Sequence, residues 1–324
     1  MAIDIKARLF DADRSDKEVE LTPAALKAVG DHQLLWIDAV LRGDASDSTD
    51  LIEMLPFDQE AVERMWESTS RPNLSIHGEY FLLRVLALRP DDPDKPIVLD
   101  LAVGRNVVLT AHREPVEFLA DLDKRIRGDT SLGGIDATDF ATVLMDGLVT
   151  SYLELTDGIL TEVDELDRQA LKSTGSSDLL GDLVAIRHRI ADGRRVLVAH
   201  RRVIAAMAGA DFEVITGKGA TPRFASITER FDSAIAAIDT AREALLGTFD
   251  IHMSRTAQRT NDVVKVLTIV SILLLPTGVI AGFMGMNIKA PYSNDDPTIF
   301  WFVLVAIAII AGLTIVALRL RRWL

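Results

Sequence analysis

Two long segments without a charged residue lie near the C-terminal end of the sequence. Val266–Met286 comprises 21 consecutive uncharged residues, and Pro297–Leu318 comprises 22. A helix of about 20 apolar residues crosses the hydrocarbon core of a bilayer. The ten residues Asn287–Asp296 between the segments are too few to fold independently. We therefore expect the two segments to form a transmembrane helical hairpin.

Basic residues lie just before the first segment of this hairpin and just after its second segment. They are Arg255, Arg259, Lys265, Arg319, Arg321 and Arg322. The connection between the segments holds only Lys289 against Asp295 and Asp296. Because basic flanks remain on the cytoplasmic side of a membrane, this pattern predicts a multi-pass protein of the cell (inner) membrane with both termini cytoplasmic.

The rest of the sequence is acidic. Residues 1–260 hold 30 Lys and Arg against 45 Asp and Glu, whereas residues 261–324 hold 5 against 3. Nucleic-acid binding requires basic patches, so we expect no nucleic-acid partner. The sequence has no Walker A motif, no Gly-x-Gly-x-x-Gly, no Gly-x-Ser-x-Gly and no paired histidines at metal-ligand spacing. We expect neither an enzyme nor a catalytic cofactor.

Residues 1–220 are predicted to form an acidic cytoplasmic α+β domain. Leu34–Ile37 and Tyr80–Val85 are apolar runs typical of strands. Ile97–Val103 and Asn106–Ala111 predict a hairpin that turns at Gly104-Arg105.

Two long helices are expected in the second half of this domain, at about Thr138–Lys172 and Asp178–Ala208. The first helix is rich in acids and the second in arginines. These residues are Glu154, Asp157, Glu162, Asp164, Glu165 and Asp167, and Arg187, Arg189, Arg194, Arg195, Arg201 and Arg202. One interpretation is an antiparallel helical hairpin joined by ion pairs. The other is that the acidic helix collects cations, and the sequence leaves both open.

A third helix is predicted to begin after Thr221-Pro222 and to continue for about 60 residues, or about 90 Å. We divide it into a stalk at 221–262 and a first transmembrane helix at 263–286. An external loop at 287–297, a second transmembrane helix at 298–318 and a basic cytoplasmic tail at 319–324 follow. The stalk carries an apolar stripe, which predicts packing against neighbours: Ile227, Phe231, Ala234, Ile238, Ala241 and Leu245.

A second stripe on this helix consists mainly of small or polar residues at a spacing of 3.5. Its members are Asp250, Ser254, Ala257, Asn261, Val264, Thr268, Ser271, Leu275, Gly278 and Gly282. In lipid, such a face needs either a helix neighbour or water. One interpretation is close helix packing through the Gly278-x-x-x-Gly282 pair. The other is the wall of an ion path, which requires several copies of the helix about an axis. The stripe alone does not decide between them.

Three segments around the first span resemble one known family. Gly285-Met286-Asn287 closes the span, and Asn261–Ile269 and Pro276–Gly282 precede it. Together with the two C-terminal spans, they are similar to the CorA family of magnesium transporters. The resemblance implies an α+β cytoplasmic domain, a long stalk helix and a two-helix transmembrane hairpin, assembled as a funnel-shaped homopentamer in the bilayer.

The resemblance also implies roles for individual residues. Gly285, Met286 and Asn287 would form the selectivity filter, where Asn287 meets the hydrated ion. The conduit would be lined by Asn261, Val264, Leu267, Leu275, Gly278 and Gly282, with Thr268 and Ser271 from the stripe as further candidates. Asp250 would lie lower on the same axis as a second metal-facing position. Lys265, Arg319, Arg321 and Arg322 would form a basic collar.

The implied function is passage of Mg2+, with Co2+ and Ni2+ as further ions, down the electrochemical gradient. Mg2+ would also act on a regulatory site whose residues the sequence does not identify. Lys289 and Ala290-Pro291 stand where magnesium-type members often carry an acidic residue. Zinc-transporting relatives of the ZntB type share this architecture, so Zn2+ transport with proton coupling is the alternative, whereas the intact Gly285-Met286-Asn287 favours Mg2+. A membrane-anchored scaffold or sensor is a third possibility, against which the small-residue stripe argues.

Overall fold

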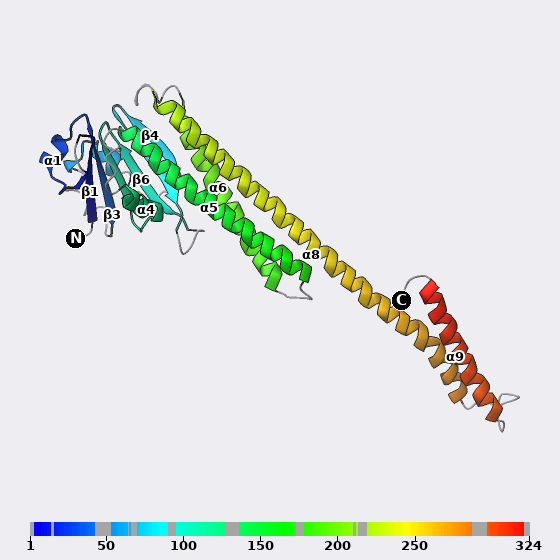
Figure 1. The fold of residues 1–324 in the computed structure, drawn as a ribbon. Coiled ribbons are helices and arrows are strands. Elements are labelled where there is room, and N and C mark those ends of the chain that lie inside the picture. Colours follow the sequence, from blue (N-terminus) through cyan, green and yellow to red (C-terminus); the bar gives the residue numbers. More distant parts are fainter. Residues whose placement is uncertain are drawn as a thin grey trace. The chain divides into compact units, whose positions relative to one another are not determined.

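The computed structural model of the chain describes residues 3–13, 16–42, 53–63, 65, 70–89, 95–126, 136–172, 178–209, 212, 219–286 and 297–320 (Figure 1). The chain forms two compact units, Met1–Thr248 and Phe249–Leu324.

The first unit contains a seven-stranded sheet in the order β2-β1-β3-β7-β6-β5-β4. The strands are β1 (Ile3–Asp11), β2 (Lys17–Glu18), β3 (Gln33–Leu41), β4 (Asn73–His77), β5 (Tyr80–Ala87), β6 (Ile97–Val103) and β7 (Val107–His112). All neighbouring pairs are antiparallel except β3 and β7, which are parallel. The short helices of this part are α1 (Pro23–Lys27), α3 (Gln59–Glu63) and α4 (Glu117–Arg125).

The predicted hairpin between β6 and β7 is confirmed. Gly104 donates its backbone N–H to the carbonyl of Val107 at 2.9 Å, which closes the turn. A turn also precedes β5, and Gly78 adopts a φ of 58° there. Glycine tolerates this left-handed conformation because it has no Cβ.

The sheet buries apolar side chains on both faces, as two separate cores. On one face, Trp36 and Leu99 belong to the core that includes Phe140 of α5. On the other face, Ile37 and Leu109 pack with Val62 of α3. The long apolar runs of β3, β6 and β7 therefore follow from burial on two sides.

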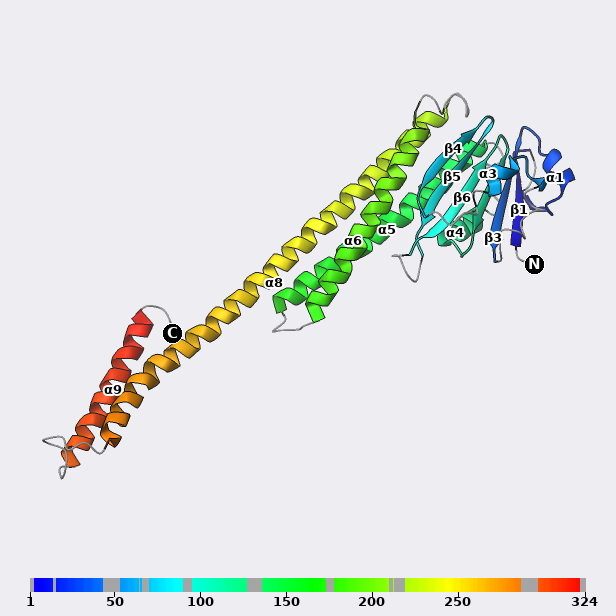
Figure 2. The same ribbon diagram turned by 180° about the vertical axis from the view of Figure 1, so that it is seen from behind.

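Four long helices follow: α5 (Ala137–Lys172), α6 (Asp178–Met207), α8 (Ala220–Gly285) and α9 (Pro297–Leu320). Within the first unit, α5, α6 and the start of α8 lie side by side (Figures 1 and 2). The predicted stripe from Ile227 to Leu245 is buried, with Phe231, Ala234 and Ile238 fully inaccessible. The long helix is confirmed as a continuous element of 66 residues.

The predicted ion pairing between α5 and α6 is confirmed only in part. Among the described residues, one salt bridge joins these helices, from Arg189 to Glu162 at 2.6 Å. Other α6 arginines bind α8 instead: Arg194 contacts Asp239 at 2.7 Å and Arg201 contacts Asp232 at 2.5 Å. Arginines of α8 pair in turn with acids of α5, as Arg223–Asp139 and Arg230–Asp146. The acids and arginines therefore join three helices, α5, α6 and α8, and not α5 and α6 alone.

The second unit consists of the C-terminal part of α8 together with α9. The two helices lie side by side in both views (Figures 1 and 2). Pro276 stands inside α8 without ending it. The segment 287–296, which contains the predicted external loop residues and Asn287, lies outside the described residues.

Candidate ion-conduction path

The predicted small and polar stripe occupies an exposed face of α8 in the isolated chain. Asp250, Asn261, Ser271, Gly278 and Gly282 are all exposed.

The apolar residues that are predicted to line the conduit are also exposed. Val264 is 54% exposed, Leu267 is 63% exposed and Leu275 is 67% exposed. Thr268 of the stripe is half-buried, so the neighbouring Leu267 is the more exposed of the two.

A different face of α8 is the covered one. Lys265, Ile269, Leu273, Pro276 and Ile280 are half-buried. At 100° per residue their average direction lies roughly 120° from the average direction of the ten stripe residues.

Half-buried positions of α9 also share one face: Val303, Ile307, Ala311 and Thr314. Because the two helices lie side by side (Figures 1 and 2), we place their contact at these two faces. Helix α9 therefore leaves the small and polar stripe uncovered.

Polar groups on the stripe can present oxygen atoms to a hydrated ion. The Thr268 hydroxyl donates to the carbonyl of Val264 at 2.7 Å, which leaves its oxygen lone pairs available. The Asn261 side chain is exposed and carries an amide oxygen. Carbonyl and hydroxyl oxygens suit hard divalent cations such as Mg2+.

The signature tripeptide is described only in part. Helix α8 ends at Gly285, and the Met286 N–H donates to the Phe283 carbonyl at 3.3 Å. Met286 is 55% exposed. Asn287, the third residue of the signature, lies outside the described part of the chain, as do Arg321 and Arg322 of the predicted collar.

The described part of one copy of the chain shows no resident metal site. Among the described residues, no three His, Asp or Glu side chains come close enough together to hold a metal ion. Helix α8 has an unburied apolar window with a mean hydropathy of 2.3, long enough to cross a membrane. Trp301–Val316 of α9 is a shorter apolar stretch within the residues searched.

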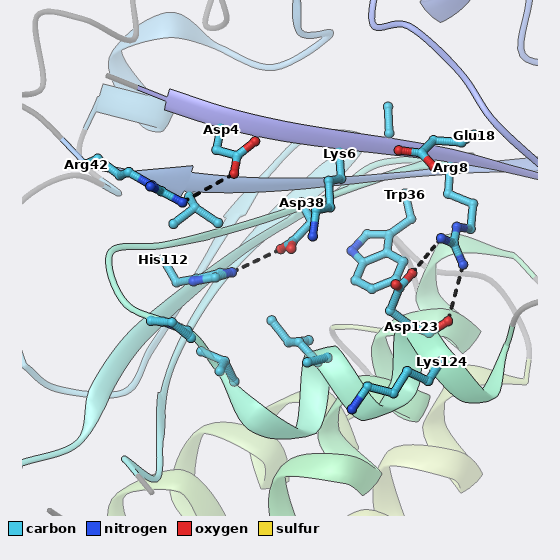
Figure 3. A pocket seen from close by; sticks show the side chains of 16 residues that line it. Asp4, Lys6, Arg8, Glu18, Trp36, Asp38, Arg42, His112, Asp123 and Lys124 are labelled. Carbon is cyan, nitrogen blue, oxygen red and sulfur yellow. Dashed lines mark hydrogen bonds and ion pairs between the residues drawn. The ribbon is translucent and has the colours of Figure 1, made fainter. Parts of the chain in front are cut away.

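The sequence interpretation missed a cleft between β1, β3 and α4, shown in Figure 3. The cleft has a volume of about 380 Å³ and is lined by acidic and basic side chains together. Arg8 contacts Asp123 at 2.8 Å, and the His112 Nε2 lies 3.2 Å from Asp38. These charges largely neutralise one another, so the cleft lacks the acidic surplus of a cation site. Charge alternation along β1 was the only sequence signal for it.

A family model described as CorA-like Mg2+ transporter protein matches residues 31–321. The cobalt/magnesium transport protein CorA of Thermotoga maritima is 24% identical over 232 residues, which are 70% of this chain and 64% of that relative. The chain thus matches less than two thirds of that protein's length.

Two solved structures share the fold. The complete CorA magnesium transporter of Methanocaldococcus jannaschii has a TM-score of 0.83 at 19% identity, covering 99% of this chain and 98% of that one. The ZntB cytoplasmic domain of Vibrio parahaemolyticus has a TM-score of 0.61 at 10% identity, covering 78% of this chain and 99% of that one.

Proposed function

The chain belongs to the family of CorA-like Mg2+ transporter proteins, and from this membership we propose that it passes divalent metal cations across a membrane. Mg2+ is the proposed preferred ion, with Co2+ and Ni2+ as further substrates. Movement follows the electrochemical gradient, in which the membrane potential contributes about 2.3 kcal/mol per elementary charge per 100 mV.

The observation that carries this proposal is the uncovered stripe of α8. Its small and polar residues face away from α9, so a single hairpin provides no partner for them. Five copies arranged about one axis would place Asn261, Thr268 and Ser271 around a shared path. We therefore propose a homopentamer in which α8 lines the path and α9 faces lipid.

Asn287 is the proposed selectivity residue, with Gly285 and Met286 as its neighbours. Mg2+ releases its water reluctantly and is usually bound with several waters retained. A ring of amide oxygens can hold such a hydrated ion without the strong binding of a carboxylate. Asp250 would meet the ion again nearer the cytoplasmic end of the path.

The proposed topology follows the charges around the spans. Residues 1–262, as an α+β domain and stalk, and the tail at 319–324 would lie in the cytoplasm. Helices at 263–286 and 298–318 would cross the membrane, and the loop at 287–297 would lie outside.

Zn2+ transport with proton coupling remains the second candidate, because the fold is also that of the ZntB cytoplasmic domain. Reconstitution of the full chain into liposomes containing an ion-sensitive dye separates the candidates. Our proposal predicts Mg2+ influx that follows the membrane potential and does not need a pH gradient. Influx of Zn2+ but not of Mg2+, dependent on an inward proton gradient, would contradict Mg2+ transport and support proton-coupled Zn2+ transport. Absence of any divalent influx would contradict both and favour a scaffold.

A further inference from the structure

The sulfur chemistry of this chain rests on its eight methionines, because the sequence contains no cysteine. Two methionines of the second unit are open to solvent: Met253 is 51% exposed and Met286 is 55% exposed. The other methionines whose side chains the structure describes are buried or half-buried: Met54, Met65, Met145 and Met207. The exposed thioethers are therefore found on α8 and directly after it.

Both exposed methionines lie beside the stripe of α8. At 100° per residue, Met253 is roughly 40° from the average direction of the ten stripe residues. Met286 follows the last residue of α8 and is the middle residue of the signature tripeptide. If the stripe lines an ion path, Met253 borders that path on its cytoplasmic side and Met286 borders its external end.

An exposed thioether reacts with hydrogen peroxide without help from another side chain. The sulfur lone pair attacks one peroxide oxygen, the O–O bond breaks and a sulfur–oxygen bond forms. The sulfur is oxidised by two electrons, and the second peroxide oxygen is reduced and leaves with both protons as water. The product, methionine sulfoxide, is polar, and methionine sulfoxide reductases convert it back. A weak sulfur acceptor thus becomes a strong oxygen acceptor.

This change has its largest expected effect at Met286, because Asn287 is the next residue. Mg2+ keeps several of its waters when it binds. A ring of sulfoxide oxygens beside the proposed ring of Asn287 amides would accept hydrogen bonds from those waters. Conduction requires binding that is weak enough for the ion to leave. Additional acceptors at this position should therefore slow the ion.

We propose that Met253 and Met286 are reversible oxidation sites for peroxides, and that oxidation of Met286 lowers divalent-cation flux. The two sites are assigned from the exposure of their side chains. The effect on flux rests on the proposed function, in which Met286 stands next to the selectivity residue.

The sites are tested by peptide mass spectrometry of the full chain in vesicles of saturated phosphatidylcholine treated with hydrogen peroxide. Met145 and Met207 are fully inaccessible and serve as internal controls. A buried sulfur reacts only in the small fraction of molecules whose fold has opened, about one in a thousand or fewer. We therefore expect Met253 and Met286 to gain one oxygen atom at least about tenfold faster than these controls. Equal rates at the exposed and buried methionines would overturn the assignment.

The effect on flux is measured in dye-loaded vesicles as the ratio of Mg2+ influx after oxidation to Mg2+ influx before it. The wild-type ratio should fall well below one and recover after treatment with methionine sulfoxide reductases. Met286→Leu, which keeps an apolar side chain but has no sulfur, should hold the ratio near one. The matched variant Met253→Leu should lose flux as the wild type does.

An unchanged wild-type ratio with Met286 fully oxidised, or an equal loss of flux in Met286→Leu, would overturn the effect on flux. The mass spectra involve no transport. A chain that oxidises at Met253 and Met286 but passes no divalent cation would therefore refute the proposed function and the flux effect, while the two oxidation sites would stand.

Discussion

The imidazole of His200 on α6 accepts a hydrogen bond from the backbone N–H of Leu86 on β5 at 2.8 Å. The Tyr152 hydroxyl on α5 donates to the carbonyl of the same Leu86 at 2.9 Å. Strand β4 pairs with β5 only as far as Arg84, so it does not reach Leu86. Two helices thus satisfy the backbone of the strand where its neighbour ends.

This contact makes the first unit sensitive to acid. Burial lowers the pKa of His200 to about 3, against an ordinary value of about 6.5. Below pH 6.5 the unfolded chain binds a proton that the folded chain does not, so stability falls as pH falls from about 6.5 toward 3. We expect the melting temperature of the full chain in detergent to decline over this range. His200→Gln, which keeps an acceptor but cannot titrate, should be less stable at pH 8 and show a shallower decline. If the melting temperatures of the wild type and of His200→Gln fell in parallel as the pH was lowered, His200 would not be the source of the acid sensitivity.

A buried ion pair joins β5 to β6. Arg84 Nε lies 2.6 Å from the Asp100 carboxylate, and the Arg84 guanidinium also donates to the carbonyl of Met65 at 2.6 Å. Removing one partner leaves a buried charge uncompensated, which costs about 3–5 kcal/mol. We expect Arg84→Met to lower the free energy of unfolding by that amount, measured by denaturant titration. The double variant Arg84→Met, Asp100→Leu should recover most of it. If Arg84→Met and the double variant lost the same free energy of unfolding, the Arg84–Asp100 pair would not be coupled.

Much of the helical part could be predicted from the sequence, because its signals are local. Pro222 marks a helix start, and the stripe from Ile227 to Leu245 has one unbroken period. The sheet was harder to predict. Strand β1 alternates charged and apolar residues over Ile3–Asp11, yet its partners β2 and β3 and the parallel pairing of β3 with β7 depend on contacts distant in sequence.

The ion-pair error has a related cause. Composition shows that α5 is acidic and α6 is basic, but it does not show which helix faces which. Arg194 and Arg201 point to Asp239 and Asp232 on α8, from which they are separated by 45 and 31 residues. The cleft beside Asp38 and His112 was missed for the same reason, since its walls come from four separate segments.

The apolar residues that are predicted to line the path are expected to gate it. In a pentamer, Leu267 and Leu275 would each form a ring of five side chains that excludes water. Leu267→Asn or Leu275→Asn should therefore raise Mg2+ leak at high internal Mg2+, measured as dye-reported influx per intact oligomer. Val270→Asn, on another face of α8, is the control and should not raise the leak. Unchanged or reduced flux in both leucine variants would contradict a gate.

Five copies are needed for the proposed path. We expect native mass spectrometry of the full chain in mild detergent to give about five times the 35.5 kDa of one chain. Retention of transport by a preparation that contains only monomers or dimers would exclude an axial path.

The most direct test concerns Asn287. Dye-loaded liposomes containing wild-type chain should take up Mg2+ in response to an inside-negative potential. Asn287→Ala should lose most of this uptake while its oligomer mass stays unchanged, because the ring of amide oxygens that meets the hydrated ion is removed. Wild-type uptake by an intact Asn287→Ala oligomer would contradict the proposed selectivity site and the conduction path built around it.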